Sequence, residues 1–380
     1  MRRFVCFITV FILCLGLSMN CGAESQAEAE ISAVAYVVMD AASRSVIYDC
    51  NADVQLPMAS TTKIMSALLC IESGDLDSEF TVDPDAIRVE GSSMGLVEGD
   101  IVTKRALCYG MLLPSGNDAA GAAAVRIAGS YENFADLMNQ RAEEIGMKST
   151  HFVTPSGLHD DRHYSTAYDM GILTAKALEN EDFREICSKE SAKVKFGNPP
   201  FDRWLKNTNK LLKNCEGVIG VKTGFTDEAG RCLVSACTRD GITLICVTLN
   251  DKNDWNDHSQ LYDLAFSEVT AIYADIPSDI RLPVAGSDAV SVPIYAKNDV
   301  IYAENGPQTN SVRWEVEAPP MLYAPVKKDS IAGYLIHYCG EFEMSRQPLF
   351  VACDADYSEN TDSKKNIFEK ISEKLRGFFS

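Results

Sequence analysis

The hydrophobic period of the chain changes along its length, and these changes limit the folds that the sequence can adopt. Residues 34–38 and 46–48 alternate as two short strands. Between residues 62 and 178, several segments have apolar residues at helical spacing, and residues 75–99 are loop-rich. Residues 218–249 return to strand patterns, with a hairpin signal at Asp240-Gly241, and residues 258–273 are predicted to form a closing helix. This order predicts an α+β fold, in which an antiparallel sheet is flanked by helices.

A different sequence pattern begins at Pro277. Short segments with alternating apolar and polar residues are separated by Pro and Gly, which predicts strands without helices. A chain of 380 residues is also long enough for two folded units. We therefore expect a first domain over residues 24–275, a small all-β C-terminal domain over 276–353, and a linker and tail over 354–380.

Residues 1–23 have the three parts of a secretory signal peptide. Arg2 and Arg3 supply the positive region, an apolar run covers residues 4–17, and small residues at 21–23 suit a cleavage site. A lipoprotein signal at Cys21 and an uncleaved anchor are the alternatives. Cleavage would place the mature protein outside the cytoplasm, with a formal charge of −19 − 2 = −21.

The charge of the chain predicts its partners. A net charge of −19 argues against binding to nucleic acid, whose phosphates it would repel. Residues 364–380 differ, because five basic and two acidic side chains give them +5 − 2 = +3 and their apolar residues fall on one helical face. We expect this tail to associate with an anionic membrane surface, such as the outer face of the cytoplasmic membrane. Docking on the protein's own surface is the alternative.

The cysteines do not form a recognisable disulfide pattern. Three of the thirteen lie in the predicted signal peptide, and most of the other ten fall within apolar helix or strand patterns. Small buried hydrophobic residues suit these positions better than a disulfide framework, and no pairing can be deduced.

A serine and a lysine, Ser60 and Lys63, lie one helical turn apart where a loop enters a helix. Serine is a poor nucleophile unless a base takes its proton, and a neutral lysine can be that base. Backbone N–H groups at a helix start also favour a developing oxyanion. A helix cap followed by an exposed lysine would give the same local pattern, so the pair alone is a weak signal.

Two further motifs follow in the order that Ser/Lys acyl transfer requires. Ser115-Gly116-Asn117 forms a turn, in which Ser115 can relay a proton to the leaving amine and Asn117 can hold the substrate amide. Lys222-Thr223-Gly224 lies on a strand. Lys222 can lower the pKa of Lys63 and, with Thr223, bind a substrate carboxylate. Gly224 allows close approach, which leaves the N–H groups of Ser60 and Phe225 as an oxyanion hole.

With these motifs the chain resembles the D-alanyl-D-alanine carboxypeptidases, the low-molecular-mass penicillin-binding proteins. The segments that carry the resemblance are 91–96, 113–120, 147–152, 163–167, 207–212 and 220–230. The resemblance implies a β-lactamase/transpeptidase-like catalytic domain over 24–275. It also implies removal of the terminal D-alanine from peptidoglycan stem peptides, acylation of Ser60 by penicillins and other β-lactams, and no metal or organic cofactor.

Other functions share the three motifs. Class A β-lactamases carry a deacylating glutamate in a Glu-x-x-Leu-Asn loop, and residues 118–221 contain no such string. A slow β-lactamase, a D,D-endopeptidase, or a penicillin-binding sensor or scaffold without turnover stays possible.

Two polar segments resemble metal sites at first sight. His159-Asp160-Asp161-Arg162-His163 is crowded into one loop, which makes a zinc site improbable. Residues 251–257 are acidic but lack the ligand spacing of a calcium site, so we expect a solvated loop there.

Overall fold

The computed structural model describes residues 30–305 and 312–358, and its elements have the predicted α+β class. The predicted signal peptide at 1–23 lies outside these residues, and so does the tail from residue 359 onward. Within the described ranges, no helix combines the length and the apolar character needed to cross a membrane.

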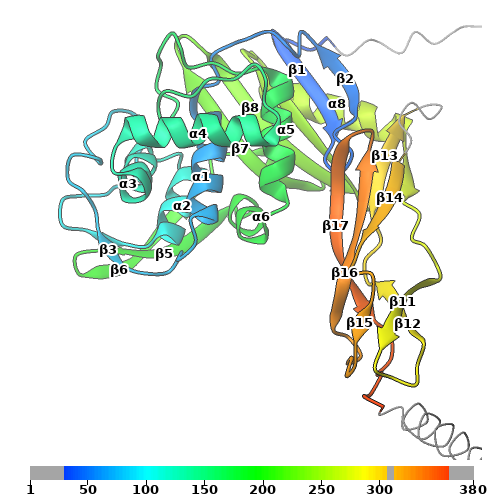
Figure 1. Ribbon diagram of the computed structural model, residues 1–380. Coiled ribbons are helices and arrows are strands. Elements are labelled where there is room, and N and C mark those ends of the chain that lie inside the picture. The colour runs from blue at the N-terminus through cyan, green and yellow to red at the C-terminus, as the bar shows by residue number, and fades with distance from the viewer. Residues whose placement is uncertain (1–29, 306–311, 359–380) are drawn as a thin grey trace, which may run out of the picture. The chain divides into compact units, whose positions relative to one another are not determined.

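A five-stranded antiparallel sheet forms the centre of the first part of the chain (Figure 1). In spatial order its strands are β2 (Val46–Cys50), β1 (Ala35–Asp40), β9 (Ile242–Leu249), β8 (Gly230–Arg239) and β7 (Val218–Thr226). The predicted hairpin forms at Asp240 and Gly241, which both have positive φ and thereby match the twist of the strands. Strand β7 is an edge strand, so one side of its backbone faces away from the sheet.

The helical block between β2 and β7 follows the predicted pattern as far as α5, whereas the short helices α6 and α7 were not predicted. It consists of the 3₁₀ turn η1 (Ala59–Thr62) and the helices α1 (Lys63–Glu72), α2 (Lys104–Leu112), α3 (Asn117–Ala128), α4 (Tyr131–Ile145), α5 (Ala167–Leu178), α6 (Glu181–Cys187) and α7 (Leu211–Asn214). The side chains of Thr103, Ser130 and Thr166 cap the N-termini of α2, α4 and α5. Gly129 and Gly146, both with positive φ, end α3 and α4.

The two faces of the central sheet pack against different helices, because strand side chains alternate between faces. Val37 and Met39 of β1 belong to the core shared with the helical block. Val38, between them, belongs to a second core with Leu261 and Tyr262 of α8 (Asp254–Glu268). Of the ten cysteines within the described residues six are buried, as expected, whereas Cys50 and Cys353 are exposed.

A second small sheet was not predicted. It has the order β3 (Phe80–Thr81), β4 (Ile101–Val102), β5 (Ser191–Gly197) and β6 (Pro200–Lys206). The alternation of Lys193 and Lys195 with buried Val194 and Phe196 was its only signal in the sequence.

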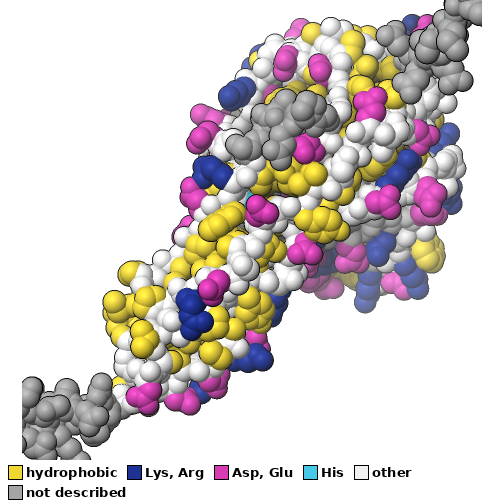
Figure 2. Space-filling model, turned by 90° about the vertical axis from the view of Figure 1, so that its right-hand side faces the viewer, with side chains coloured by type: hydrophobic (Ala, Val, Ile, Leu, Met, Phe, Trp, Pro, Cys, Tyr) yellow, Lys and Arg dark blue, Asp and Glu magenta, His cyan; other side chains and the backbone are white. Residues whose placement is uncertain are grey.

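The C-terminal part is all-β, as predicted. Its main sheet has six strands, in the order β14 (Val312–Glu317), β16 (Ile331–Cys339), β17 (Phe342–Val351), β12 (Ser291–Ala296), β11 (Ile280–Ala285) and β15 (Leu322–Tyr323). Val292, Leu335 and Leu349 are buried in a core of their own. Other hydrophobic side chains remain on the surface of this part, as one face shows (Figure 2).

The helix predicted over residues 258–273 is wrong at its end. Helix α8 stops at Glu268, and β10 (Val269–Tyr273) pairs with β13 (Ile301–Asn305). The segment Val269-Thr270-Ala271-Ile272-Tyr273 is rich in β-branched residues, which favour a pleated strand once a partner is available. The domain boundary at residue 275 stays a prediction.

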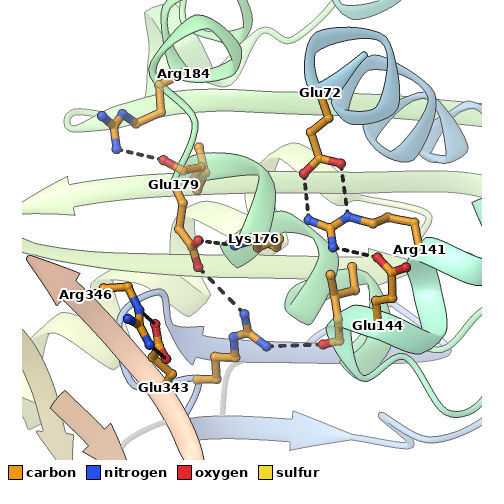
Figure 3. A network of polar contacts seen from close by, with 11 residues as sticks. Glu72, Arg141, Glu144, Lys176, Glu179, Arg184, Glu343 and Arg346 are labelled. Atoms are coloured by element: carbon orange, nitrogen blue, oxygen red, sulfur yellow. Dashed lines mark hydrogen bonds and ion pairs between the residues drawn. The ribbon is translucent and has the colours of Figure 1, made fainter. Parts of the chain in front are cut away.

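Ion pairs hold the C-terminal end of α1 (Figure 3). Arg141 of α4 donates to both carboxylate oxygens of Glu72, at 3.0 and 2.7 Å, and also to Glu144 at 3.0 Å. Two-pronged bonds of this kind fix orientation as well as distance. The opposite end of α1 carries Lys63, so the network helps to hold the helix on which the predicted site depends.

Candidate active site

Ser60 lies in the 3₁₀ turn η1, directly before α1. The hydroxyl groups of Thr61 and Thr62 donate to the carbonyl oxygens of Met58 and Ala59, at 2.6 and 2.8 Å. Ala59 has a φ of 47°, an uncommon conformation for a residue with a Cβ. The turn therefore holds the Ser60 side chain at the start of the helix, as the sequence predicted.

Lys63 is buried beside Ser60. Its Nζ atom lies 2.8 Å from Ser60 Oγ and donates to the carbonyl oxygen of Ser156 at 2.7 Å. Burial holds the pKa of Lys63 well below its usual value, the positive charge of Lys222 lowers it further, and the carboxylate of Asp118 opposes both. A lysine with a lowered pKa can be neutral near pH 7 and can take a proton from the serine.

A loop that the sequence analysis did not connect with the site supports this pair. Gly157, with a φ of 80°, passes so close to Ala59 that a Cβ would lie 1.9 Å from the Ala59 carbonyl oxygen. Its neighbour Ser156 is the carbonyl partner of Lys63. Glycine is therefore required here both for the backbone conformation and for the close approach.

His163, which the sequence placed in a possible metal cluster, is instead a buried structural residue. Its Nδ1 atom accepts from the backbone N–H of Val153 at 2.9 Å, so Nε2 carries the proton and donates to Thr62 Oγ1 at 2.8 Å. Burial lowers the pKa of His163 to about 4. No group of three or more potential metal ligands comes together in residues 30–305 and 312–358.

The middle motif lies between the cavity and the segment 90–96. Ser115, with a φ of 66°, lines the cavity. Asn117 is buried behind it and donates from Nδ2 to the carbonyl oxygen of Glu90 at 2.6 Å. Asp118 accepts from the backbone N–H groups of Met94, Gly95 and Leu96 and from Ser93 Oγ. Asn117 and Asp118 thus hold the segment that presents Ser92 to the cavity.

Strand β7 forms the other wall of the cavity. Lys222 is buried in the protein, whereas Thr223 lines the cavity. Lys222 donates to the carbonyl oxygen of Thr223 at 2.7 Å, and burial lowers its pKa to about 7. The Thr223 hydroxyl lies 2.7 Å from that of Thr208. A Cβ on Gly224 would lie 3.1 Å from the backbone nitrogen of Ser60, so the strand and the turn approach each other closely. The oxyanion hole predicted from the N–H groups of Ser60 and Phe225 depends on this close approach and stays a prediction.

These residues surround one cavity of about 540 Å³. Five of the eight predicted residues line it: Ser60, Ser115, Thr223, Gly224 and Phe225. Lys63, Asn117 and Lys222 are buried behind its wall. Six further residues complete the lining and were not predicted as site residues: Ser92, Thr208, Lys210, Arg231, Asp254 and Trp255. Two segments of the stated resemblance, 91–96 and 207–212, contain three of them, Ser92, Thr208 and Lys210, and Arg231 directly follows the segment 220–230, which is the signal that could have found them.

The expectation of a solvated loop at 251–257 is wrong. Asp251, Asp254 and Asp257 are all buried. Asp254 accepts two bonds from Arg231, and Asp257 accepts from Ser32. A run of acidic residues looks solvated in sequence, but here its partners come from distant parts of the chain.

The comparisons with known proteins point to one family. A family model described as D-alanyl-D-alanine carboxypeptidase (peptidase S11) matches residues 22–253. The D-alanyl-D-alanine carboxypeptidase DacF of Bacillus subtilis is 31% identical over 79% of this chain and 80% of its own length. Penicillin binding protein 5 of Haemophilus influenzae is similar in structure, with a TM-score of 0.62, 27% identity, and coverage of 86% of this chain and 98% of that one. The Streptomyces K15 DD-transpeptidase gives a TM-score of 0.60 with 32% identity, over 62% of this chain and 98% of that one.

Proposed function

Because the chain belongs to the D-alanyl-D-alanine carboxypeptidase family of serine peptidases, we propose that Ser60 removes the terminal D-alanine of peptidoglycan stem peptides through an acyl-enzyme. The observation that carries the proposal is the 2.8 Å contact between Ser60 Oγ and the buried amine of Lys63. A buried lysine of lowered pKa has the property that a general base needs.

The chemistry follows from the positions of the groups. Neutral Lys63 takes the proton of Ser60 as its Oγ attacks the carbonyl between the two D-alanines. The N–H groups of Ser60 and Phe225 stabilise the oxyanion that forms. When the intermediate collapses, the C–N bond breaks and the leaving D-alanine amine takes a proton relayed through Ser115. Water then hydrolyses the ester, Ser60 regains its proton, and the shortened peptide leaves.

The remaining predicted residues have supporting roles in this proposal. Lys222 is a buried cation close enough to lower the pKa of Lys63. The Thr223 hydroxyl faces the cavity for a substrate carboxylate, and Gly224 lets β7 approach the turn of Ser60. Asn117 supports the segment 90–96 through the bond from Nδ2 to Glu90. Its Oδ1 atom is buried without a partner in the described residues, so the predicted contact with the substrate amide requires this atom to become accessible when substrate binds.

β-Lactams fit the same steps with one difference. Attack of Ser60 on the lactam carbonyl opens the ring, so the amine stays attached and no fragment leaves the cavity. The penicilloyl ester should then persist, which supports slow turnover rather than an efficient β-lactamase.

The location of the enzyme is a proposal from the sequence. A cleaved signal at 1–23 would bring the catalytic domain (24–275) and the β-rich domain (276–353) to the outer face of the cytoplasmic membrane. The segment 354–380 would hold it there, because residues 364–380 carry +3 charge and an apolar face. Exposed Tyr323 and Tyr357 near the end of the described chain add apolar surface.

Co-sedimentation with anionic vesicles should be strong for the chain 24–380 and weak for one ending at Ser358. Equal sedimentation of both would contradict the role of the tail.

The test of the activity compares the mature protein with Ser60→Ala on a peptide ending in D-Ala-D-Ala. We expect D-alanine release by the wild type alone. Penicillin should add its mass to the wild type alone as well. If penicillin binds but no D-alanine is released, a sensor or scaffold is the better description. If Ser60→Ala releases D-alanine, the Ser60 mechanism is wrong.

A further inference from the structure

We propose that Arg231, rather than Lys222, is the cation that binds the C-terminal carboxylate of the substrate, and that Asp254 and Trp255 position it. The inference rests on the proposed function, because only a substrate cleaved next to its C-terminus presents a carboxylate within one residue of the scissile bond. Consecutive Cα atoms are 3.8 Å apart, so the anchor must line the same cavity as Ser60. Arg231 does, whereas Lys222 does not.

The alternation of strand β7 separates Lys222 from the carboxylate position. Successive side chains of a strand point to opposite faces, so Lys222 and Gly224 share one face and Thr223 and Phe225 the other. Lys222 is only 1% exposed, lies close enough to influence Lys63, and has its amine bonded to the Thr223 carbonyl oxygen. It is therefore on the base side of the strand, and the Thr223 hydroxyl is not.

Arg231 lies on the same face as Thr223. It is directly opposite Phe225 in the pairing of β7 with β8, and residues opposite each other in an antiparallel pair point to the same side. Ser235, four residues further along β8 and thus on the same face, contacts His258 of α8. A carboxylate that accepts from the Thr223 hydroxyl would accordingly find its positive charge in Arg231.

Two groups from α8 hold the guanidinium of Arg231. Its Nη2 atom donates to both oxygens of Asp254, at 2.7 and 3.0 Å, and the Asp254 side chain is only 4% exposed. The Trp255 ring lies 5.7 Å from Arg231 Cζ. An arginine fixed in this way has already lost much of its side-chain freedom, so binding a ligand costs less entropy.

The guanidinium keeps donors for a ligand. Within residues 30–305 and 312–358, the bonds to Asp254 use Nη2 only, and the Arg231 side chain is 43% exposed. The N–H groups of Nε and Nη1, which point to different sides of the guanidinium, therefore remain as donors, and either can bond a second carboxylate. Lys210 also lines the cavity, 5.9 Å from the Trp255 ring, and is the competing anchor.

The decisive experiment uses two substrates, an N-acylated tripeptide ending in D-Ala-D-Ala and the same peptide with a C-terminal carboxamide. The wild type should prefer the acid in kcat/KM by on the order of 10- to 100-fold, the range expected for a charge-assisted contact. Arg231→Gln should reduce the preference to near 1 by slowing only the acid. Asp254→Asn should reduce it in part, through KM for the acid. Arg239→Gln, on β8 but paired with Asp263 away from the cavity, is the matched control and should keep the full preference.

A binding measurement separates this inference from the proposed activity. In the Ser60→Ala background, calorimetry should give a lower Kd for the acid than for the amide, and the added Arg231→Gln substitution should abolish the difference. This binding measurement needs no turnover, so it tests the role of Arg231 even if the protein does not release D-alanine.

Several outcomes would overturn the inference. Equal slowing of acid and amide by Arg231→Gln would mean a structural role. An unchanged preference in Arg231→Gln, or its loss in Lys210→Gln alone, would assign the carboxylate to another group.

Discussion

The cations on the two sides of strand β7 have different surroundings. On the side of α1, Lys63 and Lys222 are buried, and burial is the first cause of their lowered pKa values. On the side of α8, Arg231 is partly exposed and has a buried carboxylate partner. A buried lysine can lose its proton, whereas an arginine stays protonated in proteins. Neighbouring residues of β7 therefore lie near different charges: the charge of Lys222 acts on the base Lys63, and Thr223 shares its face with the anion-binding Arg231.

The largest expected effect is the loss of the base on the α1 side. Lys63→Ala should slow penicillin acylation by roughly 10²- to 10⁴-fold, the usual contribution of a general base. Lys63→Arg should be as slow, because a guanidinium keeps its proton at neutral pH. Stopped-flow acylation would measure both. Substantial activity in Lys63→Arg would mean that charge rather than proton transfer matters on this side.

The close approach between β7 and the turn of Ser60 should matter nearly as much. A Cβ at Gly224 would lie 3.1 Å from the backbone nitrogens of Ser60 and Thr61, so Gly224→Ala must push the strand away. We expect acylation to fall by about 10²-fold, the typical cost of a misplaced oxyanion donor. A thermal melt close to that of the wild type is the control. An unchanged rate would contradict the oxyanion role of this contact.

The charges around Lys63 should move the acidic limb of the pH–rate profile in opposite directions. Lys222→Gln removes a like charge, so Lys63 holds its proton more tightly, its pKa rises and the limb moves to higher pH. Asp118→Asn removes an opposite charge, so the pKa of Lys63 falls and the limb moves to lower pH. Each shift should be roughly one pH unit. Acylation rates between pH 4 and 10 would test this, and shifts of the same sign would contradict it.

Two buried histidines, His163 and His258, should lower the free energy of unfolding as the pH falls. Burial lowers the pKa of His163 to about 4 and that of His258 to about 3. Unfolding restores a pKa of about 6.5, so below that pH the unfolded state binds more protons and stability is lost as pH falls toward 4. Each histidine should contribute about 1.4 kcal/mol per pH unit in this window.

Urea unfolding at pH 7, 6 and 5 would measure the slope. His258→Gln should flatten it by one proton, and so should His163→Gln, whereas exposed His159→Gln should leave it unchanged. A slope that persists in both buried-site variants would assign the acid sensitivity to other groups.

The sequence predicted what is local. Ser60 and Lys63 are one turn apart, so their contact follows from helix geometry alone. The alternation in 218–249 and the turn at Asp240-Gly241 were sufficient for the strands that carry Lys222 and Thr223. Residues 269–273 were wrongly predicted as helix, because their partner strand β13 begins almost thirty residues later.

The order of the three motifs and the α+β class were therefore fixed by residue types and spacing. Only the tertiary structure decided that Lys222 is buried away from the cavity, that Arg231 faces the cavity beside Thr223, and that Asp254 is buried as its partner. The physical reason is that spacing determines which residues of a strand share a face, but the elements that pack on each face determine which charges are buried. Those elements, α1 and α8, are separated by nearly two hundred residues of chain.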